Sequence, residues 1–261
     1  MSQITRIKQR LRVVQTIRKT TNAMRLISRS HHTRIRTIKN QFEEYSTVFS
    51  EISKNHAPAV TECTNHNITH FVAIMAHKGV CGTFNTFLTH YIKKDLELRT
   101  SSAKLPHIDV VGKQGEDILK SNDFTDLTLL DGLTINSIDA TSEILYKHIQ
   151  LLRKTGSIAI YSNFPKTFFI QKPRVSFIRP DCLKEKQQEF VQKLIDTRLA
   201  IFIRMLCLDS LLAEQAARFI SMDSSTKNAE ELIKKMNLEY NKLRQTTITN
   251  ELIDLSGALI S

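Results

Sequence analysis

The sequence has few residues that break helices, and they are unevenly placed. Of its seven glycines and five prolines, eleven lie between Pro58 and Pro180. Proline removes a backbone donor and clashes with the preceding helical turn, and glycine weakens a helix. Residues 1–57 and 181–256 contain neither and could form continuous helices of roughly 80 and 110 Å. We therefore predict an N-terminal helix over 1–57, a central domain over 58–180 and a C-terminal helix over 181–261.

Long apolar runs are also missing. None approaches the ~20 residues that cross a bilayer. The densest stretch, Leu199–Leu212, is interrupted by Arg204 and Asp209 and is predicted to be a buried helix. Ile4–Val14 alternates Arg and Lys with aliphatic residues and has no apolar segment of the signal-peptide kind, so we expect no signal peptide. A basic start without acids can also indicate a mitochondrial transit peptide, but the pattern continues without a cleavage-like break into a long helix, which favours a structural role.

Acidic residues are absent from the first 42 positions, which hold eleven Lys or Arg. Twelve basic and three acidic residues leave 1–57 with a net charge of +9, out of +11 for the whole chain. One interpretation is a solvated basic helix face. The other is an acidic partner, which could be nucleic acid, a membrane surface or an acidic protein loop.

Apolar or small residues recur along the first tract at spacings of three and four, which is typical of a coiled coil. They include Ile7, Leu11, Val14, Ile17, Thr21, Met24, Ser28, Ile35, Ile38 and Phe42. The C-terminal tract repeats the pattern at Met222, Ala229, Ile233, Met236, Tyr240 and Leu243. We predict that the two terminal helices form an antiparallel coiled coil, because the intervening domain turns the chain around.

The middle of the chain alternates short β-rich runs with helical stretches, which predicts a small Rossmann-like α/β domain with a mainly parallel sheet. The expected strands are Thr69–Ala76, His107–Val111, Leu127–Leu130, Ser157–Ser162 and Phe168–Ile178. The expected helices are Thr83–Leu98, Gly115–Ser121 and Ile138–Lys154. Pro173 should confine its strand to an edge of the sheet, because proline cannot donate to a strand ladder.

No segment has the pattern of a catalytic or ligand-binding site. Gly79–Gly82 and Gly112–Gly115 lack the third glycine of a dinucleotide fingerprint and the Gly-Lys-Ser/Thr of a phosphate loop, so both are interpreted as tight turns. His31-His32 has no carboxylate or cysteine at ligand spacing, and Cys81 has no histidine placed to activate it. The cysteines show no metal spacing and are predicted to be reduced thiols. They are Cys63, Cys81, Cys182 and Cys207.

The C-terminal tract mixes small and polar residues on every face, which suits a slim, weakly adhesive helix or a solvent-bridging one. Its segments EQAARFISMDSSTKNAEELI (Glu214–Ile233) and LEYNKLRQTTITNELIDLSGAL (Leu238–Leu259) closely resemble the C-terminal helix of the gamma subunit of F-type ATP synthase. IKQRLRVVQTIRKTTNAMRLIS (Ile7–Ser28) resembles that family's N-terminal helix. GVCGTFN (Gly79–Asn85) is similar to its GLCGGLN turn, with Thr83 and Phe84 as departures.

The resemblance implies a non-catalytic rotor without a cofactor. In this family the paired helices enter a ring of alpha and beta subunits, and the α/β domain rests with the epsilon subunit on a ring of c subunits. Proton or sodium flow turns this central stalk and drives ATP synthesis at the beta subunits. The implied location is the cytoplasmic face of a bacterial inner membrane, or alternatively the matrix face of the mitochondrial inner membrane, with membrane contact only through the complex.

The resemblance also implies two sets of site residues. Contacts with a beta subunit are expected at Arg244, Gln245, Thr249, Glu251 and Lys93. The residues assigned to the shaft and its coiled coil are Ile17, Met24, Ile35, Arg218, Met222, Ile233, Met236 and Tyr240. The chief alternative function is a basic coiled-coil protein that binds nucleic acid, which would explain the cations but not the slim polar helix. A further alternative is an α/β enzyme with helical extensions.

Overall fold

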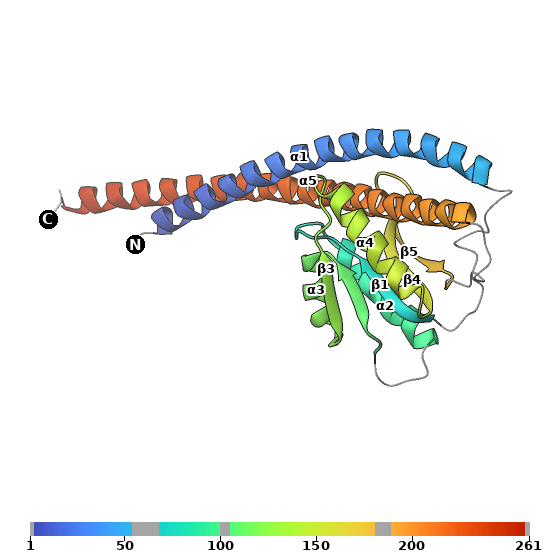
Figure 1. The fold of residues 1–261 in the computed structure, drawn as a ribbon. Coiled ribbons are helices and arrows are strands. Elements are labelled where there is room, and N and C mark those ends of the chain that lie inside the picture. The colour runs from blue at the N-terminus through green and yellow to red at the C-terminus, as the bar shows by residue number, and fades with distance from the viewer. Residues whose placement is uncertain (1–2, 54–67, 100–104, 181–188, 259–261) are drawn as a thin grey trace. The chain divides into compact units, whose positions relative to one another are not determined.

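The computed structural model describes residues 3–53, 68–99, 105–180 and 189–258 (Figure 1). They belong to two compact units. The first, called here the coil unit, combines α1 up to Ile27 with α5 from Phe219 onward, and the second, the core unit, comprises Ser28–Arg218. The domain ranges predicted from the sequence stay a prediction. The boundary between residues 57 and 58 lies outside the described residues, and the one after Pro180 falls where a described range ends.

Two long helices account for almost half of the chain. α1 (Gln3–Ser53) has 51 residues and α5 (Glu189–Ala258) has 70. Neither contains a proline, and the only glycine in them is Gly257 at the end of α5, so nothing interrupts the backbone hydrogen bonds. The two predicted terminal helices are confirmed. None of the described helices has the length and apolar character needed to span a membrane.

In the coil unit the two helices pair in antiparallel fashion, as predicted. Arg25 of α1 binds Asp223 of α5, and one turn earlier along α1 the hydroxyl of Thr226 donates to Thr21. A lower residue number on α1 therefore pairs with a higher residue number on α5, as in an antiparallel pair. Buried or half-buried side chains recur at spacings of three and four. On α1 they include Ile7, Leu11, Val14, Arg18 and Thr21, and on α5 Met222, Thr226, Ala229, Ile233, Met236, Tyr240 and Leu243.

The α1 side of this seam departs from the expected spacing at two positions. Ile17 and Met24 keep 48% and 39% of their surface exposed, whereas Arg18 and Arg25 are half-buried. The seam residue that follows Val14 is thus Arg18, four positions further on, and not Ile17, three positions further on. Arginine can occupy such positions because its aliphatic stem packs while its guanidinium reaches water or a partner.

The core unit is built on one five-stranded sheet with the order β3-β2-β1-β4-β5. The strands are β1 (Ile68–Ile74), β2 (Ile108–Val111), β3 (Leu127–Asp131), β4 (Ser157–Pro165) and β5 (Gln171–Ile178). The first four run parallel to one another, and β5 is antiparallel to β4. Every strand predicted from the sequence is present, with bounds that shift by up to three residues. Pro173 lies in the edge strand β5, as expected.

Helices cover both faces of this sheet (Figure 1). α2 (Phe84–Arg99) and α3 (Lys113–Lys120) pack on one face, around Ala73, Met75 and Tyr161. α4 (Ile138–Leu152) and α5 up to Leu212 pack on the other. Ile35 of α1 is fully buried in this second cluster, so α1 contributes to the core as well as to the coil unit.

α5 also covers the carboxyl end of β1. The hydroxyl of Ser210 donates to the carbonyl oxygen of Ile74 at 3.5 Å, and Ala213 packs against Ala76 and Cys81 just beyond the strand. In doubly wound folds the ligand crevice lies at this edge of the sheet, where the strand order reverses. Here a helix of the same chain occupies the end of the first strand.

Candidate functional site

The turn between β1 and α2 contacts α5 through its carbonyl oxygens, whereas a phosphate loop uses its backbone N–H groups. The guanidinium of Arg218 donates to the carbonyl oxygen of Gly79 and, at 3.2 Å, to that of Lys78. A phosphate cradle requires backbone N–H groups directed at the ligand. This turn directs carbonyl oxygens at a cation instead, which agrees with its interpretation as a tight turn.

Neither described cysteine has the environment of a nucleophile. Burial and the neighbouring carboxylate of Glu214 raise the pKa of the Cys81 thiol, and burial raises the pKa of Cys207 to about 12. Both thiols therefore stay protonated near neutral pH. Cys63 and Cys182 lie outside the described residues. Within the described ranges, no group of three or more His, Cys, Asp or Glu side chains could hold a metal ion.

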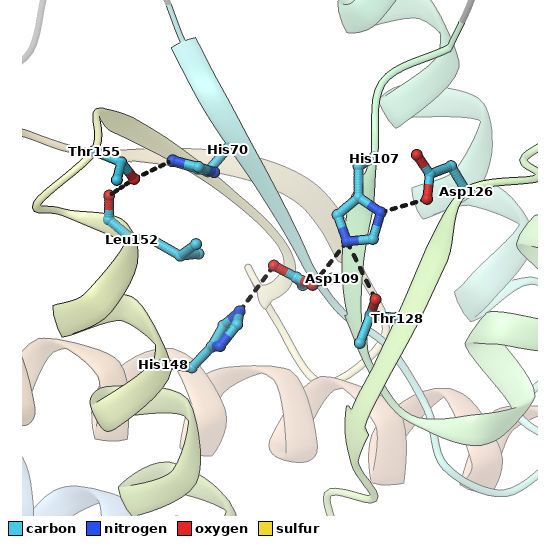
Figure 2. Close-up of polar contacts among 8 residues, drawn as sticks. All are labelled: His70, His107, Asp109, Asp126, Thr128, His148, Leu152 and Thr155. Atoms are coloured by element: carbon cyan, nitrogen blue, oxygen red, sulfur yellow. Dashed lines mark hydrogen bonds and ion pairs between the residues drawn. The ribbon is translucent and has the colours of Figure 1, made fainter.

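A polar network lies at the opposite, amino-terminal edge of the sheet (Figure 2). Its centre is Asp109 of β2, which is only 5% exposed. One carboxylate oxygen lies 3.1 Å from Nε2 of His107, and the other lies 2.8 Å from Nε2 of His148 on α4. Nδ1 of His107 lies 2.7 Å from Asp126, and its Nε2 is 3.2 Å from the hydroxyl of Thr128. The network ties α4 to β2 and β3.

A third histidine stands beside this network. Nε2 of His70 on β1 lies 2.7 Å from the hydroxyl of Thr155, which donates to the carbonyl oxygen of Leu152 (Figure 2). The pKa values of His107 and His70 are shifted in opposite directions. The hydrogen bond to Asp126 raises the pKa of His107 above its ordinary 6.5, with a further contribution from Asp109, whereas burial lowers the pKa of His70.

His107→Gln should lower the melting temperature more at about pH 6 than at about pH 8. Because the folded-state pKa of His107 is raised, its imidazolium stabilises the fold below about pH 6.5, and this contribution is lost as the pH rises through the folded-state value. His70→Gln is the matched control and should show the opposite trend, because His70 resists protonation in the folded state. Thermal melts at both pH values test this, and an equal loss for His107→Gln at both would contradict it.

Four of the five residues expected to contact a beta subunit are exposed on α5 of the coil unit: Arg244, Gln245, Thr249 and Glu251. The hydroxyl of Thr249 donates back to the carbonyl oxygen of Gln245 at 2.9 Å. Gln245 and Thr249, four residues apart, share one helix face. In the core unit, Lys93 of α2 lies 3.8 Å from Asp123, and its side chain is 42% exposed.

The residues expected to form the shaft fall into three groups. Ile35, Met222 and Met236 are buried, and Ile233 and Tyr240 are half-buried along the seam. Ile17 and Met24 are the more exposed pair described above. Arg218 belongs to the core unit, where it holds the turn after β1.

Sequence reasoning missed several charged residues that the structure brings together. Asp209 is buried between Lys39 of α1 and Arg174 of β5, and Arg25 pairs with Asp223. The only signal for Asp209 was an acid inside the apolar stretch Leu199–Leu212. For the others the sequence carried no signal, because their partners come from distant elements.

The basic residues of α1 mostly face solvent. Eight of the eleven are exposed: Arg6, Lys8, Arg10, Arg12, Lys19, Arg29, Arg34 and Arg36. In the described part of the chain, ion pairs reach Arg25 and Lys39. Most of the positive charge of this helix is thus available to an anionic surface.

Comparisons with known proteins agree with this architecture. The family model described as ATP synthase matches residues 3–259. The chain is 26% identical to the ATP synthase gamma chain of Sulfurovum sp. (strain NBC37-1), over 100% of this chain and 99% of that one. It is 28% identical to that of Campylobacter concisus (strain 13826), with the same coverage. The central stalk and c-ring structure of the Tetrahymena thermophila mitochondrial ATP synthase contains a chain of similar fold, with a TM-score of 0.63, 16% identity, and coverage of 78% of this chain and 98% of that one.

These findings give no support to the nucleic-acid-binding alternative. The match spans both long helices and the sheet between them, so it accounts for all described elements at once. The chain therefore belongs to the ATP synthase family, in which it is a gamma subunit.

Proposed function

We propose that this gamma subunit is the non-catalytic rotating shaft that couples ion flow through the membrane sector to ATP synthesis and hydrolysis at the beta subunits. The observation that carries this proposal is α5, a single helix of 70 residues. Its first part packs on the sheet of the core unit, and its later part pairs with α1 in the coil unit. A continuous hydrogen-bonded helix that belongs to both units is suited to transmit torque between them.

The proposed partners follow from the surfaces of each unit. The coil unit would enter a ring of alpha and beta subunits, whose acidic loops would meet the exposed cations of α1. The core unit would rest with the epsilon subunit on the c ring. The complex would be peripheral to the membrane, on the cytoplasmic face of a bacterial inner membrane or, alternatively, on the matrix face of the mitochondrial one.

The non-catalytic role is supported by the sites already described. The turn after β1 offers carbonyl oxygens rather than a phosphate cradle, and both described cysteines are protonated near neutral pH. The polar residues of the distal part of α5 are exposed and could contact a beta-subunit loop in successive rotary positions. Arg244 and Gln245 are the residues we assign to this contact, with Thr249 and Glu251 on the next turn and Lys93 on the core unit.

Reconstitution with alpha and beta subunits tests the proposal. The isolated chain should not hydrolyse ATP, whereas the mixture should form a stable complex with ATPase activity. Arg244→Ala with Gln245→Ala should lower assembly or ATPase rate by roughly 5- to 150-fold, which corresponds to the loss of about 1–3 kcal/mol of hydrogen bonding. Gel filtration measures assembly, and phosphate release measures the ATPase rate.

The matched control replaces two polar residues of the core unit that are not among those assigned to the contact. Lys120→Ala with Asn122→Ala removes an ion pair to Glu116 and a bond to the carbonyl oxygen of Ile118, and should change either value less than about twofold. ATP turnover by the chain alone would refute the shaft role. Normal assembly and turnover of the Arg244/Gln245 variant would refute only the residue assignment.

A further inference from the structure

A buried carboxylate in the core unit joins three elements that are far apart in the sequence. Oδ1 of Asp209 on α5 lies 2.8 Å from Nζ of Lys39 on α1, and Oδ2 lies 3.5 Å from the guanidinium of Arg174 on β5. The Asp209 side chain is only 7% exposed. This cluster of Lys39, Asp209 and Arg174 is called here the Asp209 anchor.

Both cations of the Asp209 anchor are held in place by further contacts. Lys39 lies 3.1 Å from Glu43, and both Lys39 and Arg174 lie over the ring of Phe164, at 5.9 and 4.9 Å from its centroid. Burial is the largest single influence on Lys39 and lowers its pKa, but the contacts with Asp209 and Glu43 together outweigh burial, so that the pKa is raised. Lys39 therefore carries its positive charge at neutral pH.

A second charged contact holds α5 slightly further along. Glu214 is 5% exposed and accepts a hydrogen bond from Arg218, which also donates to the carbonyl oxygens of Lys78 and Gly79. The pKa of Glu214 is raised by burial, and the charge of Arg218 opposes this shift. Glu214 and Arg218 with these two carbonyls form the Glu214 anchor, which fixes α5 to the turn after β1.

The two anchors contact α5 on different sides of the helix. Asp209 and Glu214 are five residues apart, which places them about 140° apart around the helix axis and about 7.5 Å apart along it. Apart from the hydrogen bond from Ser210 to Ile74, the described packing of α5 on the sheet is mainly aliphatic, from residues such as Leu199, Ile203 and Leu206. Hydrophobic burial is non-directional, so it opposes rotation of a helix about its own axis less specifically than a directional ion pair does.

We propose that the Asp209 and Glu214 anchors lock α5 against rotation within the core unit, so that torque passes between the helix and the sheet without slip. This inference rests on the proposed shaft function. Buried ion pairs often contribute little net stability compared with apolar residues of similar volume. A role in holding the helix under load explains charges at these positions better than a role in stability alone.

The test uses the complete ATP synthase in vesicles. Lys39→Met with Asp209→Asn removes the charges of the buried pair while it keeps their approximate volume. The charged groups that remain, Arg174 and Glu43, have side chains that are 40% and 47% exposed, so water can solvate them. With an ionophore present, ATP hydrolysis should stay within about twofold of wild type. Without it, the steady ion gradient formed per ATP hydrolysed should fall at least threefold, because the loaded shaft slips. Glu214→Gln with Arg218→Met should behave in the same way.

Two further variants separate the lock from a purely structural effect. Lys39→Arg keeps the charge and should retain the wild-type gradient. Lys147→Ala removes an exposed ion pair with Glu143 on α4 and should change nothing. A wild-type gradient in either neutral double variant would overturn the role of that anchor. Failure of both double variants to assemble would overturn the lock, since the anchors would then serve folding. A wild-type complex that assembles but forms no gradient would instead contradict the shaft function.

Discussion

A chain that lacks residues 1–40 should lose helical structure beyond the deleted part and should aggregate. The deletion removes the partner of Met222, Ala229 and Met236, which are buried along the seam of α5. It also removes Ile35, which is fully buried in the core unit. Helices gain most of their stability from the burial of an apolar face, so the distal part of α5 should fray once its seam meets water.

Far-UV circular dichroism and light scattering measure this effect. The signal per remaining residue should fall, and a synthetic peptide of residues 1–40 added in trans should restore part of it. Ile17→Asp serves as a mild control, because Ile17 is 48% exposed, and it should leave both helicity and solubility close to wild type. Unchanged helicity and solubility of the truncated chain would contradict the paired-helix interpretation.

Gly112→Ala should unfold the core unit or destabilise it by about 4 kcal/mol or more. Gly112 has a φ of 112°, which side chains with a Cβ rarely adopt, and an added Cβ would overlap the backbone oxygens of Met75 and Ala76. These backbone atoms cannot yield freely, because the N–H of Met75 donates to the carbonyl oxygen of Val111 at 2.8 Å. Denaturant unfolding monitored by circular dichroism gives the change in the free energy of unfolding.

Gly79→Ala is the matched control in the other glycine turn. The nearest atom to a Cβ there is Oε1 of Gln114 at 3.2 Å, the end of a flexible side chain, and Gly79 has no positive φ. Its cost should stay near 1 kcal/mol or below. Equal losses for the two alanine variants would show that the backbone around Gly112 adapts more easily than its geometry implies.

Local pattern was enough to predict the elements and most of the seam. Strands such as Ser157–Ser162 and the spacing from Met222 to Leu243 follow from periodicity, which depends on neighbours in sequence. The same reasoning failed to separate Ile17 from Arg18, because both continue a pattern of threes and fours. Which of the two faces α5 depends on helix phase, which the apolar pattern defines only loosely where the seam turns small and polar.

The charged contacts between separate elements could not be predicted, because their partners are distant in sequence. His148 and Asp109 are separated by 39 positions, and Arg25 and Asp223 by 198. Only the strand order and the path of α5 bring such pairs together. The roles assigned to Arg244 and Gln245 rest on resemblance for a different reason, since their proposed partner belongs to another chain.

The burial of α5 on the sheet has a consequence for how the protein is made. Ile74, Ile158 and Ile160 belong to strands that are synthesised before α5, yet they share a cluster with Leu199, Leu206 and Leu211 of that helix. At about 5–20 residues per second, the ribosome needs roughly 2–7 s to pass from the end of β5 to Leu212. During that interval one face of the finished sheet has no cover from α5. We therefore expect the nascent chain to need chaperone protection in this window, and a gene truncated before α5 to yield insoluble protein.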